Sequence, residues 1–277
     1  MKSIIYENGL LYDSKMQENL QDMHERIELN KASVICIDGS LGEGKTTLAV
    51  ELLEGYQGFD IDWKTQYAMG ASQFQEKLQI CYELGIHAII YDEAGDFNRR
   101  GAMTRLNAIL NRIFDTFRTF KIFIIMVLPR FYKLDSSLFE SSVLRMVINC
   151  HDRSEHQGNY RVYSLDTILY IMGQMSKLSV KQHCYTLATP NFRGHFLNLP
   201  TEKANKLNDI STAGKLDLIT EGVLRAKGYI TLNEIARIIN KNRGYVYKKL
   251  LDKKIKHVKI YKKVKYFENW VIDKIQE

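Results

Sequence analysis

A glycine-rich loop near the start of the chain could bind phosphate. It reads Gly-Ser-Leu-Gly-Glu-Gly-Lys-Thr and fits G-x-x-x-x-G-K-[ST] at every fixed position. Glycines let the backbone turn so that its N–H groups point at phosphate oxygens, and the helix that follows directs its positive end at the same group. The lysine supplies a charge for the β- and γ-phosphates, and the threonine hydroxyl is a ligand for Mg²⁺. The pattern predicts a site for ATP and Mg²⁺ formed by Gly39, Ser40, Leu41, Gly42, Glu43, Gly44, Lys45, Thr46 and Thr47.

Two adjacent carboxylates follow a second apolar run. His87-Ala-Ile-Ile-Tyr91 leads directly into Asp92 and Glu93. A strand that ends in this way places both acids at its carboxyl end, where open α/β sheets bind ligands. We expect Asp92 to bind Mg²⁺ together with Thr46, and Glu93 to orient and deprotonate the attacking water. A separate carboxylate for water indicates hydrolysis, with Lys45 and Glu93 as the catalytic residues.

ATP hydrolysis also requires positive charge on the γ-phosphate in the transition state, and a neighbouring subunit often supplies an arginine for it. Arg112 and Arg118 lie on a predicted helix after the acidic pair, and Arg145 precedes a predicted fifth strand. These three are the candidates for such an arginine finger. Other arginines lie in the same part of the chain, and the sequence does not choose among them: Arg99, Arg100, Arg105 and Arg130.

The elements that must position these residues alternate between strands and helices. Short apolar runs rich in β-branched residues predict strands at 33–38, 58–62, 87–91, 122–128 and 146–150. Periodic apolar positions predict helices at 14–29, 45–54, 72–84, 102–120 and 134–144. The alternation predicts an α/β fold with a mainly parallel sheet covered on both faces, a RecA-like P-loop NTPase. Beyond it we expect strands at 160–165 and 184–189 around a helix at 166–176, then an irregular stretch and a helix at 201–208.

The last part of the chain has the pattern of a small DNA-binding domain. Thr231-Leu-Asn-Glu234 is a capping box that starts a helix at 232–240, and a second helix is predicted at 243–252. A hairpin with a basic tip is predicted over 257–267, which makes the whole an α+β winged helix-turn-helix. Its second helix would enter a major groove. The expected DNA contacts are Arg243, Tyr245, Lys248, Lys249, Lys262 and Lys263.

Charge is distributed unevenly along the chain. The net charge is +7, but residues 219–277 hold 15 Lys and Arg against 6 Asp and Glu, a net +9, so the remainder carries −2. We expect an ATPase domain at 1–200, a linker or helix at 201–218 and a DNA-binding domain at 219–277. No apolar run reaches the roughly 18–20 residues that span a bilayer, and the N-terminus lacks the apolar core of a signal peptide. The expectation is a cytoplasmic protein, or one inside a viral assembly, without a membrane segment of its own.

The chain resembles the FtsK–HerA superfamily of DNA-translocating ATPases, above all its small members from viruses and mobile elements. The resemblance rests on the glycine-rich loop, on Tyr91-Asp92-Glu93-Ala94, on the arginine-bearing helix at 103–118 and on the strand ending in Val127-Leu128-Pro129. A segment like Thr189–Phe196 also follows the motor core in those proteins. The resemblance implies a homo-oligomer that forms a ring, such as a hexamer, and moves, transfers or packages DNA. In one respect the chain departs from it: a polar sensor residue often ends the fourth strand, where this chain has Leu128-Pro129.

Two alternatives to the DNA motor stay open. An AAA+-like replication initiator or helicase loader also combines an ATPase with a winged helix, but it requires an all-helical lid, against which the predicted strands at 160–165 and 184–189 argue. A DNA-binding regulator switched by nucleotide would need little turnover. Winged helices also serve as protein-interaction modules, so the basic domain alone does not establish DNA as the partner.

Overall fold

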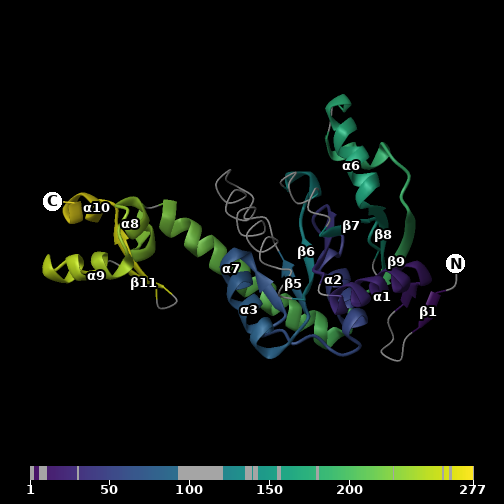
Figure 1. Cartoon of the computed structure of the whole chain (residues 1–277), viewed down its shortest axis with the longest axis horizontal. Coiled ribbons are helices and arrows are strands. Elements are labelled where there is room, and N and C mark those ends of the chain that lie inside the picture. The colour runs from purple at the N-terminus through teal and green to yellow at the C-terminus, as the bar shows by residue number, and fades with distance from the viewer. Residues whose placement is uncertain are drawn as a thin grey trace. The chain divides into compact units, whose positions relative to one another are not determined.

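The chain divides into two compact units, Met1–Leu207 and Asn208–Glu277. The computed structural model describes residues 3–5, 11–29, 31–92, 121–134, 139, 143–154, 157–178, 181–226, 228–257, 259–261 and 264–276. The first unit is built around a seven-stranded sheet with the order β4-β5-β6-β3-β7-β8-β9 (Figure 1). The strands are β3 (Ser33–Gly39), β4 (Tyr67–Met69), β5 (Ala88–Asp92), β6 (Phe123–Val127), β7 (Leu144–His151), β8 (Gln157–Ser164) and β9 (Phe192–Leu197).

The first five of these strands are parallel, and the last two are antiparallel to their neighbours. Parallel strands require crossover connections, and helices supply them here. They are α2 (Lys45–Gln57) and α3 (Gly70–Leu84). Helix α1 (Ser14–Glu28) precedes β3, and α6 (Leu165–Gln174) lies between the antiparallel strands β8 and β9. A hairpin of β1 (Ser3–Ile5) and β2 (Leu11–Asp13) precedes α1. Short 3₁₀ turns follow the later strands: η2 (Phe131–Lys133), η3 (Met175–Lys177) and η4 (Lys181–Thr186).

Both faces of the sheet are covered. Val34 and Cys36 of β3 belong to one apolar cluster with residues of α3 and α6, among them Phe74 and Ile168. Neighbouring side chains on a strand point to opposite faces, so the residues between them face the other side. There α2 packs, and the Tyr56 ring lies 4.6 Å from that of Phe123. The predicted α/β architecture with a mainly parallel sheet is therefore confirmed.

The strand predicted at 58–62 is wrong. The preceding helix continues to Gln57 and ends at Gly58, which takes the left-handed conformation with φ of 76°. Beyond Gly58, backbone amides bond to side chains instead of to a neighbouring strand. Ile61 N donates to the Glu54 carboxylate at 3.1 Å, and Asp62 N donates to the Gln66 amide oxygen at 2.9 Å. The strand at this edge of the sheet is β4, five residues further on.

The strand predicted at 184–189 is also wrong. The first three of these residues are the end of the 3₁₀ turn η4, with Cys184 buried and the Tyr185 hydroxyl bonded to Asp38 of β3. The strand that pairs with β8 is instead β9, within the stretch expected to be irregular. Gly194 of β9 lies against the Tyr160 ring of β8, and Gly158 of β8 lies against the Phe196 ring of β9. At both places a glycine leaves room for the ring on the neighbouring strand. The predicted helices at 102–120 and, for the most part, 134–144 lie outside the described residues.

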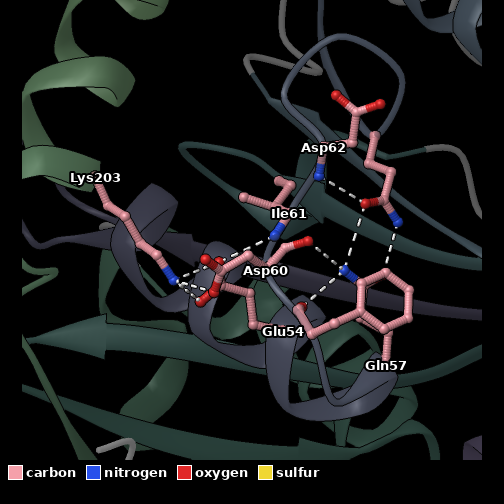
Figure 2. A network of polar contacts seen from close by, with 8 residues as sticks. Glu54, Gln57, Asp60, Ile61, Asp62 and Lys203 are labelled. Carbon is pink, nitrogen blue, oxygen red and sulfur yellow. Dashed lines mark hydrogen bonds and ion pairs between the residues drawn. The ribbon is translucent and has the colours of Figure 1, made fainter. Parts of the chain in front are cut away.

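A polar network joins the carboxyl end of α2 to the first turn of α7 (Thr201–Ala226) (Figure 2). Lys203 Nζ lies 2.9 Å from both oxygens of Glu54 and 2.7 Å from Asp60 Oδ1. Glu54 is buried, and the loop carrying Asp60 is held by Gln57, whose amide donates to the carbonyls of Phe59 and Asp60. The helix expected at 201–208 is present, as the first part of this long helix.

The second unit is α+β. Strands β10 (Tyr229–Thr231), β11 (Lys259–Tyr261) and β12 (Val264–Glu268) form an antiparallel sheet of order β10-β12-β11. Helices α8 (Leu232–Ile238) and α9 (Arg243–Asp252) are joined by a turn in which Asn240 has φ of 53°, and α10 (Val271–Gln276) follows. The predicted capping box is present: Thr231 Oγ1 accepts from Glu234 N, and the Glu234 carboxylate accepts from Thr231 N. Among the helices of the described segments, none is long and apolar enough to cross a membrane.

Candidate nucleotide-binding site

The glycine-rich loop connects β3 to α2 through glycines that no other residue could replace without strain. Gly39 has φ of 144°, Gly42 of 86° and Gly44 of 77°. A Cβ at Gly39 would lie 2.5 Å from the carbonyl oxygen of Cys150, and one at Gly44 would lie 2.9 Å from the Phe196 ring. Both positions thus combine a left-handed backbone with a close approach from another strand. The loop opens at the carboxyl end of the parallel strands, where α2 begins.

Thr46 and Asp92 meet at this end of the sheet. Thr46 Oγ1 donates to Asp92 Oδ2 at 2.9 Å, and the Tyr67 hydroxyl donates to the same oxygen at 2.5 Å. Asp92 is the last residue of β5 and is 4% exposed, so its carboxylate is held from two sides in a buried position. A hydroxyl and a carboxylate are hard oxygen ligands of the kind that Mg²⁺ takes. The pair fits a magnesium ion bound beside the phosphates.

Lys45 follows the last glycine of the loop and curls back over it. Its Nζ donates to the Ser40 carbonyl at 2.7 Å. Burial lowers the pKa of Lys45, while the nearby carboxylates of Asp92 and Asp38 act in the opposite direction. The ammonium group therefore lies over the loop, between acidic groups on two strands. This is the position from which it can bind phosphate oxygens.

A buried carboxylate that the sequence did not single out lies directly before the loop. Asp38 is 1% exposed and accepts three hydrogen bonds, from Phe131 N at 3.0 Å, Asn149 Nδ2 at 3.0 Å and the Tyr185 hydroxyl at 2.5 Å. Burial raises the pKa of Asp38, and the three hydrogen bonds act against that rise. Burial and the charge of Asp38 also raise the pKa of Tyr185. Four segments of the chain thus converge on one carboxylate beside the loop.

The antiparallel strands contribute to the loop from the other side. Arg153 N, just after β7, donates to the Glu43 carboxylate at 3.0 Å. The guanidinium of Arg153 donates to Asn198 Oδ1 at 2.8 Å, which ties the end of β9 to the same corner. Because Phe196 also packs on Gly44, the strands β8 and β9 support the conformation of the loop.

Several residues predicted for catalysis cannot be placed. Glu93, Arg112 and Arg118 lie outside the described residues. Arg145 is described, and it lies at the amino end of β7, where Leu144 pairs with Val34. This is the end of the sheet opposite the loop, and Arg145 Nη2 lies there 4.0 Å from Asp22 Oδ2. Within its own subunit, Arg145 is therefore remote from the loop.

The residues that sequence reasoning missed are Asp38, Tyr67, Asn149 and Tyr185. Asp38 carried a signal, since a lone acid ends an otherwise apolar strand immediately before the loop. The other three carried none, because a single tyrosine or asparagine has no spacing that relates it to a distant loop.

Helix α9 presents the polar face predicted for DNA contact. Val246 and Leu250 are buried against α8 and the small sheet, while Arg243, Tyr245 and Lys248 are exposed and Lys249 is half-buried. Tyr247 is also exposed, and Lys241 Nζ lies 5.8 Å from the centre of the Tyr245 ring. Lys262 and Lys263 lie outside the described residues.

Comparison with known proteins gives weak likenesses only. No family model matches the chain, and neither does any curated protein. Among solved structures, the chain is similar to a KaiC-like protein from Pyrococcus horikoshii (10% identity, TM-score 0.31, 48% of this chain and 79% of that one). It is also similar to the N-terminal domain of zonular occludens toxin from Neisseria meningitidis (13% identity, TM-score 0.31, 57% of this chain and 98% of that one). A third similar structure is PCH-2 from C. elegans (18% identity, TM-score 0.34, 53% of this chain). The matched region spans only 46% of the length of PCH-2.

At these scores the comparisons assign neither a family nor an activity. The class of the fold follows from the molecule itself: an α/β sheet with a glycine-rich loop after β3, an acid at the end of β5, and β6 inserted between those two strands. This is the architecture of a RecA-like P-loop NTPase.

Proposed function

We propose that this protein is an ATPase that binds DNA and works as an oligomeric motor, moving, transferring or packaging DNA as the FtsK–HerA superfamily does. The observation that carries the ATPase part is the hydrogen bond between Thr46 and Asp92, 46 residues apart in sequence. It brings Thr46, the proposed metal ligand of the loop, to the carboxylate of Asp92 at the end of β5. Lys45 lies over the same loop. When bound, Mg²⁺ would neutralise charge on the β- and γ-phosphates.

Hydrolysis in this proposal uses Glu93 and an arginine from another copy of the chain. Glu93 follows Asp92 directly in the sequence, and in this proposal its carboxylate is the base for the attacking water. Arg112, Arg118 and Arg145 are the proposed fingers. The position of Arg145 at the far end of the sheet supports a role across a subunit boundary rather than within its own site. A finger in trans contributes roughly 10³–10⁵ in rate, so isolated subunits would be nearly inactive.

The second unit is proposed to be a winged helix that contacts duplex DNA. Two observations support this: the pair α8–α9 is joined by a tight turn, and α9 exposes a basic and aromatic face. The hairpin of β11 and β12 corresponds to the predicted wing, and in the sequence Lys262 and Lys263 separate its two strands. Side chains of this kind bind phosphates largely without regard to sequence.

The test is the rate of ATP hydrolysis with and without duplex DNA, measured at several protein concentrations alongside the mass of the assembly. We expect hydrolysis that requires Mg²⁺, rises with assembly and is stimulated by DNA. Lys45→Ala should abolish turnover without loss of folding, because it removes a half-buried charge that faces the loop rather than the core. Unchanged hydrolysis in this variant would exclude the loop as the site.

A nucleotide-switched DNA-binding regulator is the second candidate. The same buried Thr46–Asp92 pair would serve a protein that holds ATP without rapid turnover. Binding of ATP with slow hydrolysis, independent of DNA and of protein concentration, would favour the regulator over the motor.

A further inference from the structure

The antiparallel half of the sheet carries a row of polar side chains on one face. Arg161 of β8 lies directly opposite Arg193 of β9 and, on its other side, directly opposite Asn149 of β7. Directly opposite residues point to the same face of a sheet, so the row continues to Asp38, whose carboxylate accepts from Asn149 Nδ2 at 3.0 Å. The two arginines therefore lie side by side, in the row of the residue that precedes the glycine-rich loop.

A second polar row lies on the same face, two residues nearer the loop end of these strands. Asn159 of β8 is directly opposite His151 of β7 and His195 of β9. His151 Nδ1 lies 2.9 Å from the Asp152 carboxylate, whereas His195 takes part in none of the ion pairs between described residues. The face is therefore polar over two rows, and its permanent positive charges are the two arginines.

Within the described part of the chain, the facing arginines have no carboxylate to offset their charge. Neither takes part in an ion pair there. Arg193 is exposed, and Arg161 is half-buried with a buried Nε that has no hydrogen-bond partner among the described residues. Burial raises the pKa of Tyr163, and the charges of both arginines act against that rise. Like charges directly opposite each other destabilise a sheet, which favours a role for this pair in binding an anion.

The anion that fits this surface best is an extended one. Neighbouring strands are about 4.7–4.9 Å apart, so each guanidinium can contact a different phosphate of one chain of phosphates. The exposed position of Arg193 on the last strand of the sheet leaves room for a ligand that extends beyond the pair. Guanidinium groups are the usual partners of nucleic-acid phosphates, and α9 exposes a basic and aromatic face of the same chemistry. Both observations favour DNA over an acidic protein segment.

We propose that the paired arginines of β8 and β9 bind the phosphate backbone of DNA, which gives the first unit a DNA contact separate from that of α9. This inference rests on the proposed function, in which DNA is the partner. The contact lies on the strands that support the glycine-rich loop, because β9 runs on from Arg193 to Phe196, whose ring lies against Gly44. DNA bound here would touch the strand that packs on the nucleotide site.

The first test measures the affinity of the intact protein for a mixed-sequence DNA duplex at several salt concentrations. Arg161→Gln with Arg193→Gln removes both charges and keeps most of each side-chain stem. Binding should weaken roughly tenfold or more at about 0.1 M salt, and the slope of log K against log salt should fall by about 1.8, or about 0.9 for each phosphate contact. Arg193→Gln alone changes only an exposed side chain, so it should fold normally and lower the slope by about 0.9.

Lys31→Gln with Lys64→Gln is the matched control. These exposed lysines belong to the first unit, one before β3 and one before β4 at the opposite edge of the sheet. Their removal changes the net charge by the same amount and should leave the slope unchanged. Arg161→Lys with Arg193→Lys keeps both charges and should keep most of the slope.

A photocrosslink tests the location of the DNA without relying on affinity. The four native cysteines are buried, so an introduced cysteine can be labelled selectively with a photoreactive group. His195→Cys places that group on the same face as the arginines and leaves both of them intact. It should crosslink to bound duplex, whereas Lys64→Cys with the same group should not.

Two results would overturn the proposal: undiminished affinity and slope in both glutamine variants, or no crosslink from position 195 while the duplex stays bound. Loss of ATP hydrolysis without DNA, at unchanged DNA affinity, would overturn it as well, because the arginines would then act on nucleotide. A wild-type chain that binds no DNA would instead remove the partner named in the proposed function, so the two failures are distinguishable.

Discussion

At the scale of single residues, the first unit buries several carboxylates close to the nucleotide site. Asp38 and Asp92 are each held by two or more donors, which keeps a buried charge tolerable. Glu51 is different. It is 1% exposed on α2, its hydrogen bond comes from the Leu197 backbone, and it is one turn from Glu54. Burial, and then the negative charge of Glu54, raise the pKa of Glu51 to about 8.

Glu51 should make stability depend on pH. The folded protein keeps the proton up to about pH 8, whereas the unfolded chain releases it near pH 4.5. Stability from this group is therefore present at low pH and is lost as pH rises from about 4.5 to about 8. Between pH 6 and pH 8 the wild type should lose on the order of 2 kcal/mol more than Glu51→Gln, which cannot ionise. Urea unfolding at both pH values measures this, and an identical pH dependence in the two proteins would contradict it.

At the scale of elements, α2 is anchored at both ends. Its first residues, Lys45 and Thr46, belong to the candidate nucleotide site, and its last turn takes part in the network with α7 (Figure 2). Lys203 comes from the first turn of α7 and is the cation that faces the buried Glu54. Burial disfavours the charge on Lys203, but hydrogen bonds and attraction from Asp60 and Glu54 outweigh it, and its pKa is raised.

Removing Lys203 should destabilise the first unit. Lys203→Met would leave the carboxylate of Glu54 buried, with the Ile61 amide as its remaining donor among the described residues. We expect a loss of about 1–3 kcal/mol, below the full cost for a deeply buried pair because Lys203 is partly exposed. Lys206→Met, an exposed lysine one turn later, is the control. Thermal unfolding measures the effect. Adding Glu54→Gln to Lys203→Met should recover part of the lost stability. Equal stability of the two lysine variants would contradict a stabilising role for Lys203.

At the scale of the whole molecule, charge and chemistry are divided between the two units. The buried carboxylates and the candidate magnesium ligands belong to the first, while residues 219–277 carry a net +9. The helix α7 runs through the boundary between the units without a break in its hydrogen-bonded structure.

Neutralising α9 should weaken binding to duplex DNA and reduce its salt dependence. Each phosphate that the protein no longer neutralises lowers the slope of log K against log salt by about 0.9, so Arg243→Ala with Lys248→Ala should lower it by about 1.8. The control pair is Lys31→Ala with Lys64→Ala, two exposed lysines of the first unit. The measurement is a titration of duplex DNA at several salt concentrations. Unchanged affinity and slope in the α9 variant would favour a protein partner for this unit.

The sequence by itself determined the features that depend on short stretches of chain. Local spacing predicts the glycine-rich loop, the apolar strand before the loop and the apolar strand that ends in Asp92. It also predicts the helices α1 to α3 and the capping box at Thr231. Their signals are local because each relies on the backbone preferences of adjacent residues.

Only the tertiary structure decided which distant residues complete the site. The partners of Asp38 lie 93, 111 and 147 residues away, and they meet it because the strands β3 and β7 and the 3₁₀ turns η2 and η4 converge at one edge of the sheet. The apolar character of 184–189 indicated burial, but burial alone does not separate a strand from a 3₁₀ turn packed on a sheet, and β9 took the place beside β8.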